Sequence, residues 1–187
     1  MKRSFERLYA MSGFLGMILP ILDAWKYGGI PPSISDSYYS PAIVVFTLIL
    51  GALGITLYNN QGFDKLDKYC NRLAGIAAIG VISFPCNSPK LLLWFIPFPV
   101  IHYVSACILF LTFAIMCFVF REVRSRKGET KQKNWRNTIY LLCAIFIIIG
   151  MAWAKFIQIY WGEVIALESF GIAYMVQGKV FSILNDK

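Results

Sequence analysis

The sequence has few charged residues for its length. Of its 187 residues, 15% are charged and 58% are hydrophobic, whereas a soluble domain has roughly 25% charged and 45–50% apolar residues. With a mean hydropathy of +0.61, this composition excludes an ordinary soluble domain and predicts a membrane protein. The net charge is +8, and the basic residues lie between apolar runs. Orientation of the chain in the membrane and attraction to anionic lipids explain this charge, so we expect no nucleic-acid partner.

Histidine is nearly absent, which excludes several kinds of intramembrane site. A haem held by two histidines needs a second one, and a zinc site needs about three ligands, usually histidines; the chain has a single histidine, His102. No C-x-x-C pair occurs among the five cysteines. The chain also has no G-x-S-x-G motif and no phosphate loop. We therefore expect no metal and no cofactor.

Apolar runs of helical length predict an all-α, polytopic membrane protein, a six-transmembrane-helix bundle in one domain, residues 1–187. The runs cover about residues 8–25, 41–58, 68–84, 100–120, 138–156 and 161–177. Because roughly 20 residues are needed to cross a bilayer and Pro85 ends the third run, that helix must either begin earlier, near Lys68, or lie in a thinned or tilted arrangement. Its small residues predict a central helix, and the bulky aliphatic run 138–156 predicts a helix that faces lipid.

The distribution of Lys and Arg predicts that both termini are cytoplasmic. A predicted basic cytoplasmic loop, 121–137, includes seven of the eighteen Lys and Arg residues. With both termini inside, fifteen of the eighteen are cytoplasmic, and the exceptions are Lys26, Lys90 and Lys155. This asymmetry agrees with the positive-inside rule. The loop also predicts binding to anionic lipid head groups.

Residues 86–99 form an apolar, proline-rich segment on the predicted outer side. Pro89, Pro97 and Pro99 exclude a regular spanning helix there. We expect an interfacial or re-entrant segment, because broken backbone is tolerated in a membrane only where protein or water satisfies it.

Few polar residues remain on the predicted outer side. The ligand-binding candidates are Asp36, Ser40, His102, Glu163 and Glu168. Glu168 lies about six residues into the last helix, or roughly 9 Å deep at 1.5 Å per residue, where an ionisable group costs about 2.5–3.5 kcal/mol. Glu168 therefore either lines a functional cavity or makes a structural hydrogen bond inside the bundle. We expect it within reach of His102 or the Asp36 loop.

Two classes of function stay open. The first is a lipid-binding or partner-binding membrane protein with an outer-leaflet polar cavity and no catalysis. The second is a membrane-embedded enzyme acting on a lipid head group, with His102 as acid or base and Asp36 or Glu168 orienting it. A proton-linked transporter that uses Glu168 is a weaker third option. Structural roles compete with each of these, since His102 also suits an interfacial hydrogen bond and Asp36 a turn cap.

Four short motifs occur in order along the chain: Ser33-Ile34-Ser35-Asp36, NRLAGIAAIGVISFP, HYVSA and ESFGIAYM. With them the chain resembles the Frag1/DRAM/Sfk1 group of six-helix membrane proteins and its prokaryotic relatives. The resemblance implies a role in lipid remodelling or membrane regulation, with Asp36, His102 and Glu168 at the group's polar positions. We expect an integral protein of a prokaryotic inner or plasma membrane, with membrane lipids as partners. Assembly into a homo-oligomer stays open.

Overall fold

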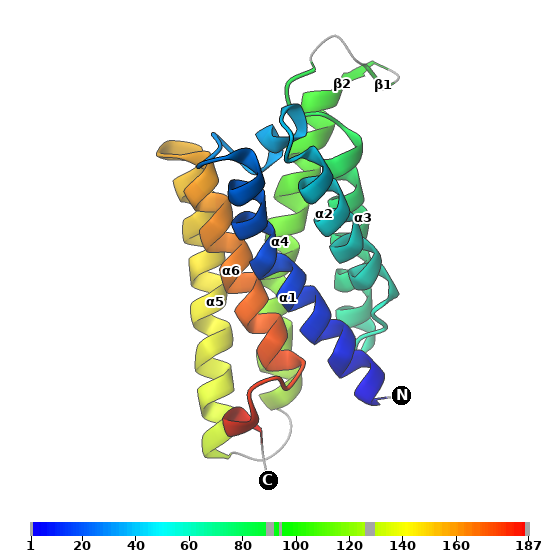
Figure 1. Cartoon of the computed structure of the whole chain (residues 1–187). Helices are drawn as coiled ribbons and strands as arrows, with labels where there is room; N and C mark the ends of the chain where they lie inside the picture. The colour runs from blue at the N-terminus through cyan, green and yellow to red at the C-terminus, as the bar shows by residue number, and fades with distance from the viewer. Residues whose placement is uncertain (1, 89–91, 94, 126–129, 186–187) are drawn as a thin grey trace.

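The computed structural model describes residues 2–88, 92–93, 95–125 and 130–185. Within them, six α-helices form a bundle (Figure 1). They are α1 (Lys2–Tyr27), α2 (Ile43–Asn59), α3 (Lys65–Ser83), α4 (Phe98–Ser125), α5 (Lys131–Phe156) and α6 (Ile159–Gln177). The remaining elements are two short 3-10 helices, η1 (Ser35–Tyr39) and η2 (Ser182–Leu184), and two strands, β1 (Leu92–Leu93) and β2 (Ile96–Pro97).

Each helix packs mainly against its neighbours in the chain, and α1 closes the bundle by packing against α6. Both chain ends lie at one end of the bundle together with the α2–α3 turn, and η1 and the β1–β2 hairpin lie at the other (Figure 1). We call these the terminal end and the η1 end.

Four helices are long and apolar enough to cross a membrane: Ser4–Tyr27, Phe98–Arg121, Lys131–Phe156 and Ile159–Gln177. This confirms the prediction of a helical protein with transmembrane helices. The second helix, α2, is apolar but has only 17 residues, or about 26 Å of length against a hydrocarbon core of about 30 Å. The third helix, α3, has four charged residues in its first half, Lys65, Asp67, Lys68 and Arg72.

The prediction that residues 121–137 form a loop is wrong in its extent. Most of it is helical, because α4 continues to Ser125 and α5 begins at Lys131. The early start of α5 follows from its N-cap: the Thr130 side chain accepts a hydrogen bond of 3.1 Å from the backbone N–H of Lys133. The middle of the predicted loop, residues 126–129, lies outside the described residues.

The predicted outer segment, 86–99, contains a small hairpin. Leu92 pairs with Pro97 and Leu93 with Ile96 in an antiparallel arrangement. Helix α4 already begins at Phe98, so Pro99 lies in its first turn, where the missing backbone N–H has no intrahelical partner to lose. Residues 89–91 and 94 of the segment lie outside the described part of the chain.

Glycines bring α6 close to both of its neighbours. A Cβ added to Gly171 would lie 2.9 Å from the backbone oxygen of Gly13 in α1. A Cβ added to Gly150 in α5 would lie 2.6 Å from the backbone oxygen of Gly162. Among the four candidate spans, α6 is the most buried, with 56% of its apolar window inside the bundle, and α5 the least, with 28%. The helix over 138–156 is therefore peripheral in the bundle, as the sequence predicts.

The prediction that the third helix is central is wrong. Helix α3 packs mainly against α2 and α4, and its outer face is open, with Leu73 and Ile76 exposed. Its small residues permit a close approach to one neighbour: a Cβ on Gly75 would lie 2.7 Å from the backbone oxygen of Gly54 in α2. Small residues therefore mark a tight helix pair here rather than a helix surrounded on all sides.

We expect Ala78→Leu to destabilise the bundle by about 1–3 kcal/mol, the usual cost of overpacking. Ala78 is fully buried, and a Cβ on Gly54 of α2 would already lie 3.2 Å from its Cβ. Ile148→Leu is the control, because Ile148 is 51% exposed on α5. Denaturant titration of both variants in detergent micelles measures the difference, and equal stabilities would contradict the α2–α3 packing.

Candidate functional site

The connection between α1 and α2, residues 28–42, covers the η1 end of the bundle (Figure 1). We call it the cap segment. Gly28 and Gly29 lead the chain out of α1 with φ values of 87° and 157°, which glycine adopts without a steric penalty. Ser33 then closes a local turn with Asp36: its Oγ donates to Asp36 Oδ2 at 2.9 Å and accepts from the Asp36 N–H at 3.0 Å.

Two acidic side chains from different helices accept hydrogen bonds from the cap segment. Glu163 of α6 accepts a hydrogen bond of 2.7 Å at Oε2 from the backbone N–H of Ile34. Asp23 of α1 accepts one of 2.7 Å at Oδ2 from the Ser37 hydroxyl. Asp23 and Ser37 are both fully buried. These two contacts tie the cap segment to α6 and α1.

His102 of α4 holds the cap segment from a third side. Its Nδ1 lies 2.8 Å from the backbone oxygen of Phe84 and 3.0 Å from that of Val81. Carbonyl oxygens only accept, so Nδ1 has the hydrogen. In the neutral ring Nε2 is then an acceptor, and the Ser35 hydroxyl donates to it at 3.0 Å. The environment thus selects one tautomer of a histidine that is 2% exposed.

Among the described residues, no hydrogen bond joins Asp36 to His102. Asp36 Oδ1 accepts a hydrogen bond of 2.8 Å from the Asn87 side chain, in the chain after α3. The thiol of Cys86 lies 3.7 Å from the backbone oxygen of Ser35 and 3.9 Å from Asp36 Oδ1. Burial, with the charge of Asp36 as a smaller cause, raises the pKa of Cys86 to about 11. The cap segment therefore covers a thiol that is 4% exposed.

Two hollows flank the cap segment. The first is open, about 360 Å³ in volume, and lined by Tyr27, Pro32, Asp36, Tyr39, Ser40 and Asn87. The second lies under the cap segment, is about 30 Å³ in volume, and is lined by Ser35, Glu163 and nine apolar residues: Leu19, Ile34, Phe46, Leu50, Val81, Ala106, Leu109, Phe110 and Leu167. Ser35 and Asp36, adjacent in sequence, therefore line different hollows.

The structure brings four of the five predicted site residues to the cap segment. Asp36 and Ser40 belong to it, and the Ser40 hydroxyl donates to the backbone oxygen of Ser37 at 3.0 Å. His102 and Glu163 bind it from α4 and α6. Within the described chain, no group of three His, Cys, Asp or Glu side chains is placed to hold a metal ion.

Glu168 lies elsewhere, so its predicted proximity to His102 or the Asp36 loop is wrong. It is partly buried, and among the described residues no hydrogen bond or ion pair joins it to His102 or to the cap segment. Five residues rotate an α-helix by about 140° beyond one full turn. Glu163 and Glu168 therefore face different directions. Glu163, not Glu168, is the acidic residue of α6 that contacts the cap segment.

A family model matches residues 14–178 of the chain, described as a family of unknown function, DUF7103. The chain belongs to DUF7103. No curated protein and no solved structure matches it. The matched region includes the whole cap segment together with His102 and Glu163, so the site described above lies inside the part that defines a DUF7103 protein.

The terminal end of this DUF7103 protein has a polar network that the sequence analysis missed. Asp67 of α3, which is 1% exposed, accepts hydrogen bonds from the Tyr9 hydroxyl, from the Phe63 N–H at 2.9 Å and from the Asn71 side chain at 2.6 Å. The Tyr174 hydroxyl of α6 donates to Asn71 Oδ1 at 3.1 Å. The i, i+4 spacing of Asp67 and Asn71 was the available signal. Since the Asp67 carboxylate has three donors, the network is a structural link between α1, α3 and α6.

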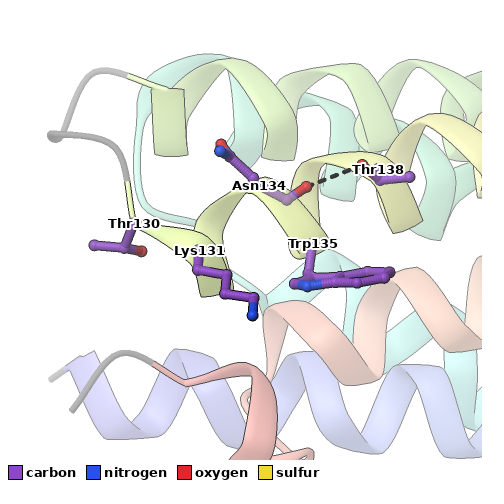
Figure 2. Close-up of a pocket in the computed structure, with 5 residues that line it drawn as sticks. All are labelled: Thr130, Lys131, Asn134, Trp135 and Thr138. Carbon is purple, nitrogen blue, oxygen red and sulfur yellow. Dashed lines mark hydrogen bonds between the residues drawn. The ribbon is translucent and has the colours of Figure 1, made fainter.

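A further hollow, of about 650 Å³, lies at the start of α5 and is lined by Thr130, Lys131, Asn134, Trp135 and Thr138 (Figure 2). Lys131 and Trp135 project on the same side of the helix (Figure 2), as their i, i+4 spacing requires. The Thr138 hydroxyl donates to the backbone oxygen of Asn134 at 3.0 Å. An exposed lysine beside an exposed indole therefore borders the basic stretch.

Proposed function

We propose that this DUF7103 protein binds the head group of a membrane lipid in the open hollow beside the cap segment. The observation that carries the proposal is the lining of that hollow, where Asp36, Ser40 and two tyrosines surround about 360 Å³ of open space. It lies at the end of helices long enough to cross a membrane, where head groups are found. The resemblance to the Frag1/DRAM/Sfk1 group agrees with a lipid ligand.

The lining of the hollow favours a positively charged head group. The carboxylate of Asp36 supplies negative charge, and the rings of Tyr27 and Tyr39 are of the type that binds ammonium groups through cation–π contacts. Choline and ethanolamine head groups present such an ammonium. We therefore expect zwitterionic phospholipids to bind better than phosphatidylglycerol.

Asp36→Asn should weaken the binding of phosphatidylcholine about 10-fold, because it removes the charge and keeps an oxygen that can accept from Asn87. Binding of a fluorescent phosphatidylcholine to the full chain in micelles measures this. Asp64→Asn is the matched control, since Asp64 lies at the start of α3 at the terminal end. Equal affinities for the Asp36→Asn and Asp64→Asn variants would contradict the proposed site.

The proposal includes six membrane crossings, with both termini in the cytoplasm and the η1 end outside, in a plasma membrane or a prokaryotic inner membrane. The support is the charge asymmetry, with fifteen of eighteen Lys and Arg residues assigned to the terminal end. In this orientation the lysine and tryptophan of the α5 hollow (Figure 2) face the cytoplasmic leaflet. They suit the phosphate of an anionic lipid there.

Cysteine labelling tests the orientation. In a background without the native cysteines, a membrane-impermeant maleimide should label Ile30→Cys in intact cells and label Gln61→Cys only after permeabilisation. Both positions are exposed, one in the cap segment and one in the α2–α3 turn. The reverse pattern would overturn the assignment, and labelling of both from outside would reduce the number of crossings.

A further inference from the structure

Ser35 and His102 have the mutual geometry of a nucleophile and its general base. The Ser35 hydroxyl donates to His102 Nε2 at 3.0 Å, within the 2.6–3.2 Å expected of such a pair. The backbone oxygens of Phe84 and Val81 hold the Nδ1 hydrogen. They orient the ring and select its tautomer, as a carboxylate does in a Ser-His-Asp triad.

The competing interpretation is structural, because a buried imidazole needs partners for both nitrogens. Two features of Ser35 are not required by a purely structural role. Ser35 also lines the small cavity under the cap segment, so the residue is not enclosed by packed atoms on every side. It also lies at the junction of the two hollows, since the next residue, Asp36, lines the open polar one.

We propose that Ser35 is a catalytic nucleophile, activated by His102, that attacks an acyl ester of a membrane lipid. This rests on the proposed function, because the head group is placed in the open hollow beside Asp36. In such a lipid an ester joins the polar part to the apolar chain. Ser35 lies between a polar hollow and a cavity lined mostly by aliphatic and aromatic side chains. With the head group in the polar hollow and the acyl chain toward the apolar cavity, the ester bond of the lipid would lie at Ser35.

The reaction conserves atoms and charge. Ser35 Oγ adds to the ester carbonyl carbon while its proton passes to His102 Nε2. The tetrahedral intermediate then expels the alcohol of the lipid, which takes that proton, and Ser35 is left acylated. Water attacks the acyl-serine with His102 as base again, and a fatty acid and free Ser35 result. Apart from water, no further reactant is needed.

The cap segment must move for this chemistry. Ser35 is 8% exposed, and the cavity beside it, about 30 Å³, has the volume of about one water molecule. An ester reaches Ser35 only when the cap segment swings away from α6. Its glycine pair, Gly28 and Gly29, forms the connection to α1, and the hydrogen bond from Ile34 to Glu163 is the contact that opening breaks.

A fluorophosphonate with a long alkyl chain tests the nucleophile on the full chain in micelles. The expected result is one adduct per protein, located at Ser35 by mass spectrometry, and none in Ser35→Ala. His102→Gln should slow labelling at least 100-fold, the lower range for loss of a general base. Ser83→Ala is the control and should be labelled like the unmodified chain. The Ser83 hydroxyl donates a hydrogen bond to the backbone oxygen of Ile79 rather than to a general base.

Melting temperatures and phosphatidylcholine binding of each variant separate chemistry from folding. Ser35→Ala should stay folded and keep phosphatidylcholine binding while losing the adduct, with a melting temperature lowered by the loss of the hydrogen bond to His102. Absence of an adduct at Ser35, or labelling of a folded His102→Gln variant at the unmodified rate, would overturn the nucleophile. Lipid binding that persists with no adduct leaves the proposed function standing and rejects this inference. An adduct at Ser35 with unchanged binding in Asp36→Asn rejects the head-group site and keeps the nucleophile.

Discussion

Replacing Asp67 by alanine is expected to lower the free energy of unfolding by about 2–4 kcal/mol. The change leaves the Tyr9 hydroxyl and the Phe63 N–H without their acceptor in a buried site, and the Asn71 amide keeps only its hydrogen bond to the backbone oxygen at position 67. Each buried donor left unsatisfied costs about 1–3 kcal/mol, and somewhat less between transmembrane helices. Denaturant titration of the full chain in micelles measures the loss.

Asp64→Ala is the matched control for this prediction. Asp64 is exposed and caps α3 by accepting a hydrogen bond of 2.9 Å from the Asp67 N–H. Loss of such a cap costs about 1 kcal/mol. A conservative change, Asp67→Asn, keeps one acceptor oxygen and should fall between the two. If Asp67→Ala cost no more than Asp64→Ala, the network would not be what joins α1, α3 and α6.

Glu163→Ala should increase the reaction rate of Cys86 with maleimide at least 10-fold at pH 8. The substitution removes the acceptor of the Ile34 N–H, so the cap segment opens more often and uncovers the thiol. In the closed form the pKa of Cys86 is raised to about 11, against about 8.5 for an exposed cysteine. The unmodified chain should therefore react faster as the pH rises toward 11.

Glu168→Ala serves as the control on the same helix. Glu168 has no hydrogen bond or ion pair with the cap segment within the described chain, so its removal should leave the Cys86 rate unchanged. Mass spectrometry assigns the adduct to Cys86 rather than to the exposed Cys107. Equal rates for the Glu163 and Glu168 variants would show that Glu163 does not hold the cap segment.

Most of the fold could be predicted, because hydrophobic length and proline position act locally. The six predicted helices all occur, with ends that differ by up to about seven residues. The largest error, at the start of α5, came from treating basic residues as a loop. Charged side chains continue a helix readily once Thr130 caps it.

The candidate site was predicted in its location and only partly in its members. Charge asymmetry and helix order placed Asp36, Ser40, His102 and Glu163 at one end of the bundle, where they meet. Ser35 had no signal of its own, because a serine in a polar loop is ordinary. Its importance comes from a hydrogen bond to a histidine 67 positions away in the chain.

The sequence by itself determined that the chain is a helical membrane protein with a polar end, because composition and apolar run length depend on no contact between helices. Only the tertiary structure decided which of two carboxylates on one helix reaches the cap segment. That choice depends on the rotation of α6 about its own axis, which its glycine contacts with Gly13 in α1 and Gly150 in α5 establish. It also decided that Asp67 is buried, since Tyr9, Asn71 and Tyr174 surround it only after α1, α3 and α6 have packed.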